Sequence, residues 1–69
     1  MPALRFTEHG ILRVNADSEI DDIVTALKEV AVHTGAVPVW IGPRRIIISP
    51  KDSQDEIRRK VTAVFMMIP

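Results

Sequence analysis

Residues 37–49 read VPVWIGPRRIIIS, and the architecture of the chain follows from this stretch. Apolar residues recur with a period of two on both sides of Gly42-Pro43, as they do in half-buried strands. The stretch therefore predicts two antiparallel strands joined by a tight turn. With Pro43-Arg44 as the two-residue loop, Trp40 lies opposite Ile47, and both side chains point away from the core face.

Pro38 constrains the place of the first of these strands in its sheet. Proline has no N–H to donate to a β-ladder and is confined largely to sheet edges. We therefore expect this strand at an edge, or paired on one side only at Pro38, and the sequence leaves the strand order open.

A shorter hairpin precedes this one. Leu4 and Phe6 alternate with polar residues, as do Leu12 and Val14, and Glu8-His9-Gly10 supplies a three-residue loop in which Gly takes a positive φ. The register that results sets Phe6 opposite Leu12, so one face of the hairpin is apolar. Both phenylalanines, Phe6 and Phe65, are expected in the core.

Each hairpin is followed by a helix. Asp17 or Ser18 is expected to cap a first helix at residues 18–34, and Ser53 with Glu56 forms a capping box for a second. Apolar residues at three- and four-residue steps give each helix a core-facing stripe: Ile20, Ile23, Val24, Leu27, Val30 and Ala31 in the first, and Ile57, Val61, Val64, Phe65 and Ile68 in the second.

The predicted fold is a single α+β domain spanning residues 1–69, with the order ββαββα. Neither hairpin–helix half can bury its apolar stripe alone, so both helices are expected on one face of a four-stranded, mostly antiparallel sheet.

Composition excludes several classes of protein. The chain has no cysteine, which removes disulfides and thiolate chemistry. Its longest apolar run, residues 63–68, is far shorter than the roughly twenty residues of a membrane span, and no secretory signal opens the sequence. We expect a soluble, cytoplasmic protein.

No catalytic, metal or cofactor site is predicted. Ser18 and Ser53 are accounted for as helix caps, and no base is placed to activate Ser49. His9 falls in a turn, and His33 falls at the C-terminal end of a helix, where its cationic form suits the helix dipole. The acidic cluster of Asp17, Glu19, Asp21 and Asp22 lacks the spacing of a calcium loop. We expect no enzymatic activity.

The neutral net charge conceals a polarised molecule. Residues 1–36 hold three bases and six acids, a net of −3, whereas residues 37–69 hold six bases and three acids, a net of +3. Candidate contacts for an anion or a nucleic acid are Arg44, Arg45, Arg58, Arg59 and Lys60. The alternative is an ordinary solvated face, in which Asp55 pairs with Arg59 and Glu56 with Lys60.

The sheet face away from the helices is the strongest candidate site. Alternation leaves the residues Trp40, Ile47, Ile11, Arg5 and Arg13 on it, with no third helix to cover them. Trp and Arg are enriched at binding hot spots, so we expect a protein interface there, formed with a second copy as a homodimer or with a target protein.

Two other functions compete with this one. In the first, the face binds single-stranded nucleic acid by stacking a base on Trp40, in an arrangement like the sheet platform of RNA-recognition domains but without their paired aromatics. In the second, the acidic first helix acts as a charge mimic that captures a basic partner.

Overall fold

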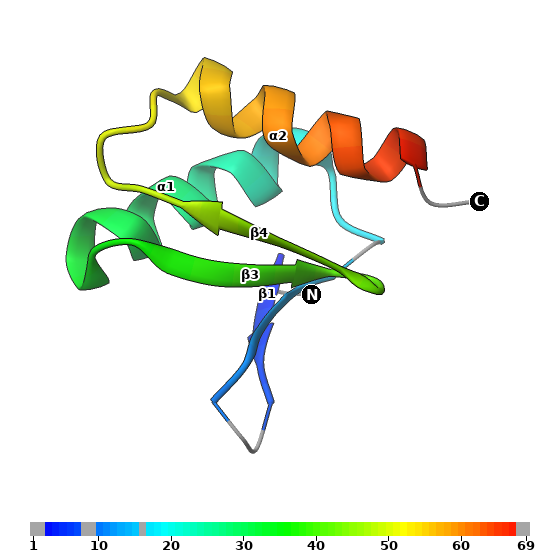
Figure 1. Cartoon of the computed structure of the whole chain (residues 1–69), viewed down its shortest axis with the longest axis horizontal. Coiled ribbons are helices and arrows are strands. Elements are labelled where there is room, and N and C mark those ends of the chain that lie inside the picture. Colours follow the sequence, from blue (N-terminus) through cyan, green and yellow to red (C-terminus); the bar gives the residue numbers. More distant parts are fainter. Residues whose placement is uncertain (1–2, 8–9, 16, 68–69) are drawn as a thin grey trace.

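The computed structural model describes residues 3–7, 10–15 and 17–67. Its elements follow the order β1 (Leu4–Phe6), β2 (Leu12–Val14), α1 (Ile20–Thr34), β3 (Val37–Ile41), β4 (Arg44–Ile48) and α2 (Gln54–Met67). This is the predicted ββαββα order of an α+β protein (Figure 1).

The four strands form one mixed sheet in the order β1-β2-β3-β4. The β1–β2 and β3–β4 pairs are antiparallel, and β2 and β3 are parallel. The parallel pair arises because α1 carries the chain back across the sheet, as a crossover between parallel strands requires. The predicted register of the first hairpin, Leu4 with Val14 and Phe6 with Leu12, is confirmed.

Of the two alternatives for Pro38, the edge position is wrong, because β3 lies inside the sheet, whereas pairing on one side only at Pro38 is confirmed. The register between β2 and β3 joins Leu12 to Val39 and Arg13 to Trp40, one step beyond Pro38. Pro38 itself is registered with Ile47 on β4. A proline is tolerated in this inner strand because the short β2 begins only at Leu12.

The predicted register of the second hairpin is also wrong. The turn is Gly42-Pro43, which places Trp40 opposite Arg45 and Pro38 opposite Ile47. Gly42 has φ of +59°, as the first central residue of a type II′ turn requires. The ring of Pro43 holds φ at about −65°, which suits the second central residue of this turn. In the observed register the pair Val39–Ile46 lies between Trp40 and Ile47, and these two side chains remain on the same face.

The helices begin close to the predicted positions. The N-cap residue of α1 is Glu19, which makes no side-chain capping bond, so the prediction of Asp17 or Ser18 as the cap is wrong. Those two residues belong to a turn around Asn15, whose Oδ1 accepts from the Asp17 N–H and whose carbonyl accepts from the Ser18 N–H. At α2 the Ser53 half of the predicted capping box is present, because Ser53 Oγ accepts from the Glu56 N–H at 3.1 Å, whereas these two described residues form no return bond from the Ser53 N–H to the Glu56 carboxylate.

Both helices cover the same face of the sheet. Alternate strand residues reach the core from below and the predicted stripes reach it from above; the buried residues are Leu12, Ile23, Val24, Leu27, Ala31, Val39, Ile41, Ile48, Ile57, Val61 and Val64. Ile68 of the predicted second stripe lies outside the described residues.

Phe6 is the exception among the predicted core residues, since it is 63% exposed. It lies on the outermost strand, in the hairpin that projects beyond the helices in Figure 1, so α1 does not reach over it. Phe65, by contrast, packs partly buried against the core. Within the described part of the chain, no helix combines the length and the hydropathy needed to cross a membrane.

Candidate functional site on the outer sheet face

A row of four side chains crosses the sheet on the face opposite the helices. The registers join Arg5 to Arg13, Arg13 to Trp40, and Trp40 to Arg45. We call these four residues the arginine–tryptophan row. Neighbouring strands lie about 4.8 Å apart, so the row runs about 14 Å from one edge of the sheet to the other.

Burial confirms the side on which this row lies. Val39 and Ile41 on either side of Trp40 are buried in the core, whereas Trp40 is only half-buried. Arg5 and Arg45 at the two ends are exposed, and Arg13 is half-buried. Since successive strand residues point to opposite faces, the indole faces away from the helices.

A second row lies beside the first on this outer face. The Thr7 N–H donates to the Ile11 carbonyl at 2.9 Å, and the Ile11 N–H donates to Thr7 Oγ1 at 3.1 Å. Pro38 is registered with Ile47, and Ile11 and Pro38 directly precede the registered pair Leu12–Val39. We call Thr7, Ile11, Pro38 and Ile47 the apolar row. Ile47 is 56% exposed, so this row presents apolar surface to solvent next to the cationic row.

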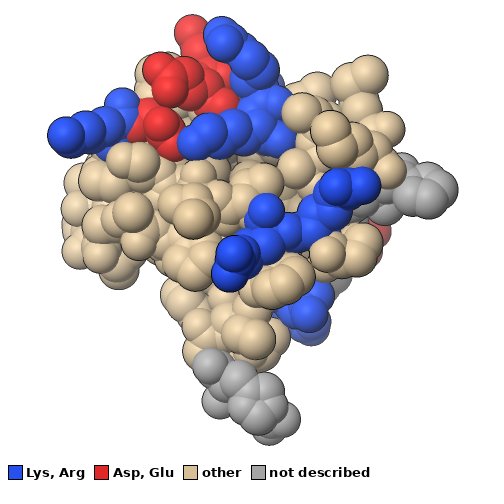
Figure 2. Space-filling model, in the orientation of Figure 1, with Lys and Arg blue, Asp and Glu red and all other residues tan. Residues whose placement is uncertain are grey.

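The electrostatic character of the sheet is one-sided. The four strands contain Arg5, Arg13, Arg44 and Arg45 and no acidic residue. Figure 2 shows Lys and Arg side chains across the middle of the view, while most of the visible carboxylates gather at the upper edge, near the start of α2. Guanidinium groups flanking an indole can also make cation–π contacts with its faces. The outer face therefore carries positively charged side chains next to one large aromatic surface.

The basic residues predicted on α2 do not join this row. Arg58 forms an ion pair with Asp21 of α1, which ties one member of the acidic cluster to the second helix. Arg59 is exposed. Within the described residues the ion pairs join Arg58 to Asp21 and Lys60 to Asp52, so the predicted pairs of Arg59 with Asp55 and Lys60 with Glu56 are not formed.

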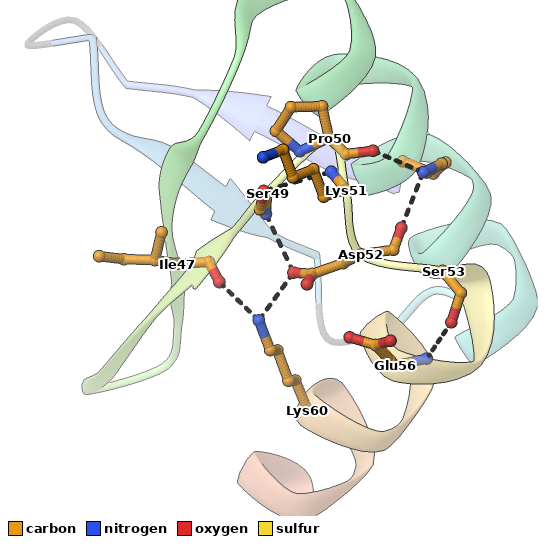
Figure 3. A network of polar contacts seen from close by, with 9 residues as sticks. Ile47, Ser49, Pro50, Lys51, Asp52, Ser53, Glu56 and Lys60 are labelled. Carbon is orange, nitrogen blue, oxygen red and sulfur yellow. Dashed lines mark hydrogen bonds and ion pairs between the residues drawn. The ribbon is translucent and has the colours of Figure 1, made fainter.

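Lys60 is occupied by a structural role instead. Its Nζ donates to Asp52 Oδ2 at 2.7 Å and to the Ile47 carbonyl at 3.1 Å (Figure 3). Asp52 Oδ2 also accepts from the Ser49 N–H at 3.0 Å. The hydrogen bond from Lys60, assisted by the one from Ser49, lowers the pKa of the Asp52 carboxyl.

Lys28 of α1 anchors the same segment from the other side. Its Nζ donates to the carbonyls of Pro50 at 2.8 Å and Asp52 at 2.7 Å. Two lysines from two helices thus hold the connection between β4 and α2. These groups satisfy one another, so the network fixes the fold rather than offering a free binding site.

Among the other side chains considered as catalytic candidates, the structure describes those of His33, Ser49 and Ser53. His33 is exposed at the end of α1, and the hydroxyls of Ser49 and Ser53 accept backbone bonds from Lys51 and Glu56. His9 lies outside the described residues. Across residues 3–7, 10–15 and 17–67, no three metal-ligating side chains gather into a cluster.

The fold brings all of the predicted interface residues to one face: Trp40, Ile47, Ile11, Arg5 and Arg13. Arg45, which was predicted as an anion or nucleic-acid contact, joins them, and Arg44 lies opposite Ile41 on the other face. A type II′ turn at Gly42-Pro43 was the signal that would have placed Arg45 beside Trp40.

The chain matches no protein-family model, and neither the curated proteins nor the solved structures compared with it contain a match.

Proposed function

We propose that this protein is a small, non-catalytic binding protein whose outer sheet face docks a target protein carrying acidic groups. The observation that carries the proposal is the arginine–tryptophan row, in which Arg13 and Arg45 flank Trp40 on an uncovered sheet. Carboxylates of a target would bind the guanidinium groups in bidentate fashion.

The apolar row favours a protein target in particular. Protein interfaces combine an apolar centre, rich in aromatic side chains and Arg, with a polar rim. Trp40 and Ile47 supply such an apolar surface, and Arg5 and Arg45 stand at its two ends. The proposed target therefore offers an apolar anchor between acidic side chains.

Self-association through this same face, the other form of the predicted interface, is opposed by charge. Two copies placed face to face would bring their arginine rows together, and the strands have no acidic residue to neutralise them. Like charges in contact across an interface cost several kcal/mol. We therefore assign the face to a foreign acidic target.

A display selection of random peptides on the immobilised protein tests this function. We expect enrichment of sequences that combine Asp or Glu with large apolar residues. Binding of the selected peptides should fall at least tenfold for Trp40→Ala and for Arg45→Glu, because each removes a central contact. Arg59→Glu, an exposed arginine on α2, is the matched control and should bind as the parent does. Selected peptides without acidic residues, or equal loss in all three variants, would contradict the proposal.

A single-stranded nucleic acid is the second candidate ligand. The register that places a guanidinium on each side of Trp40 favours it, because a base can stack on the indole while phosphates bind the flanking arginines. Titration of Trp40 fluorescence with a mixed single-stranded oligonucleotide distinguishes the two candidates. Nucleic-acid binding predicts an affinity that falls linearly with the logarithm of salt concentration. No quenching at low salt would reject this ligand and leave the protein target.

A further inference from the structure

The outer edge of β1 is open for pairing. Among the residues that the structure describes, β1 is the first strand of the sheet and has one registered neighbour, β2. The Ala3 carbonyl accepts from Asn15, and the Thr7 N–H donates to Ile11, so odd-numbered residues of β1 direct their backbone groups toward β2. Because these groups alternate along a strand, Leu4 and Phe6 direct their N–H and C=O groups away from the sheet.

The opposite edge of the sheet is obstructed. Lys60 Nζ, reaching down from α2, occupies the carbonyl of Ile47 on β4. Charged side chains at an edge strand are a common means of blocking further pairing. Arg44 and Arg45 add two exposed cations to the same strand. The two edges therefore differ, and β1 is the one suited to accept another strand.

An apolar groove runs beside β1 on the helix side of the sheet. It has a volume of about 410 Å³ and lies between β1 and the flank of α1. Its lining is Ala3, Leu4, Phe6, Ala26, Glu29, Val30, His33 and Thr34. Phe6 lines the groove, yet its side chain is 63% exposed. The same edge thus carries both an exposed aromatic side chain and an apolar hollow.

We propose that a second copy of this chain pairs with β1, antiparallel to it, about a two-fold axis at Arg5. In this register Leu4 lies opposite the partner's Phe6, and Phe6 opposite the partner's Leu4. Both are residues whose backbone groups point outward, so each pair exchanges two hydrogen bonds. The partner's Phe6 then enters the groove beside Leu4 and Val30, and Phe6 enters the partner's groove in return.

Self-complementarity is what identifies the occupant as a second copy. A two-fold interface requires that one surface carry both the projecting and the receiving part. On β1 the projecting part is Phe6 and the receiving part is the groove at Leu4, and these two residues lie on either side of the central Arg5. Each copy contributes a three-residue strand and one groove, a small surface of the kind found in weak or transient complexes, so we expect a dimer that dissociates on dilution.

The register also predicts an unusual salt dependence. Arg5 lies opposite its own copy, with its side chain on the outer sheet face, and like charges directly opposite one another are destabilising. Salt screens this repulsion. The dimer should therefore tighten as salt rises, and Arg5→Gln should tighten it about two- to fivefold at low salt.

Sedimentation equilibrium over a wide concentration range measures this association. We expect concentration-dependent dimers for the parent chain and monomers for Phe6→Glu, because a carboxylate cannot enter the apolar groove. Ile47→Glu, an equally exposed apolar position near the other edge, is the control and should still dimerise. Circular dichroism checks that both variants fold. A parent chain that stays monomeric at millimolar concentration, or dimers that survive Phe6→Glu, would overturn the proposal.

A cysteine cross-link tests the register directly. The chain has no cysteine, so Arg5→Cys introduces a single thiol. Opposed residues of this non-hydrogen-bonded type have Cα atoms about 4.5 Å apart, within the range of disulfides. Oxidation should give a covalent dimer much faster than for Arg45→Cys, which lies on the far edge. Equal rates would reject the two-fold axis at Arg5.

The Phe6→Glu test is independent of the proposed function of the outer face. Phe6 lies on the helix side of the sheet and Trp40 on the outer side. The Phe6→Glu variant should therefore still bind acidic peptides as a monomer. Loss of peptide binding with intact dimers, or the reverse, separates the failure of one proposal from the failure of the other.

Discussion

The two hairpins of this protein have similar sequence patterns but different surroundings. The β3–β4 hairpin has five-residue strands, and its residues Val39, Ile41 and Ile48 are buried beneath both helices. The β1–β2 hairpin has three-residue strands and leaves Phe6 exposed. An alternating apolar pattern therefore specifies which face of a strand is apolar, but burial depends on whether a helix extends over it.

The largest expected difference between the hairpins is in the cost of removing an apolar side chain. Ile48→Ala should lower the free energy of unfolding by about 2–5 kcal/mol, because Ile48 is 0% exposed and its truncation leaves a cavity. Phe6→Ala should lower it by less than about 1 kcal/mol at concentrations where the chain is monomeric. Urea unfolding followed by circular dichroism measures both. A larger loss for Phe6→Ala would show that the first hairpin is covered in solution.

The two turns offer a smaller contrast. Gly42 has φ of +59° and Gly10 has φ of +77°, a region in which a residue with Cβ is strained. Substitution of either by Ala should cost about 1–2 kcal/mol of stability. We expect the loss from Gly42→Ala to appear in the global unfolding transition and the loss from Gly10→Ala mainly as faster amide exchange in the first hairpin. Equal effects on all amides would mean that the two hairpins unfold as one unit.

The smallest effect concerns the polar network next to the second hairpin. The hydrogen bonds from Lys60 and Ser49 hold the pKa of Asp52 below its ordinary value. A carboxyl whose pKa is lower in the folded state contributes stability that is present above its unfolded value, about 3.9, and lost as the pH falls through its folded value. Asp52→Asn should remove this part of the acid dependence.

The pH dependence of the unfolding free energy below about pH 5 measures this contribution. The first hairpin has no corresponding ion pair among the described residues, so Arg5→Gln is a suitable control. It should leave the pH dependence of the unfolding free energy unchanged. If the unfolding free energy falls equally with decreasing pH in the parent and in Asp52→Asn, Asp52 is not held in the ionised form.

Most of the local structure could be predicted from residue patterns. The period of two at Leu12 and Val14 and the three- and four-residue steps from Ile23 to Ala31 identified strands and helix correctly. They did so because side-chain direction is set by backbone geometry over a few residues. Ser53 as a cap and Gly10 as a positive-φ residue depend on equally local chemistry, and both are confirmed.

The neighbours of each strand depended on interactions between distant parts of the chain. Whether Pro38 is paired on one side or on both depends on where β2 begins, far earlier in the chain, and no local pattern carries that information. The place of Trp40 between Arg13 and Arg45 required both the crossover through α1 and the phase of the Gly42-Pro43 turn. Moving a two-residue turn by one position shifts every cross-strand partner by two residues, so the partners change while each side chain keeps its face. For that reason the residue types of the outer face could be read from the chain, whereas their order in a row emerged only when the sheet was assembled.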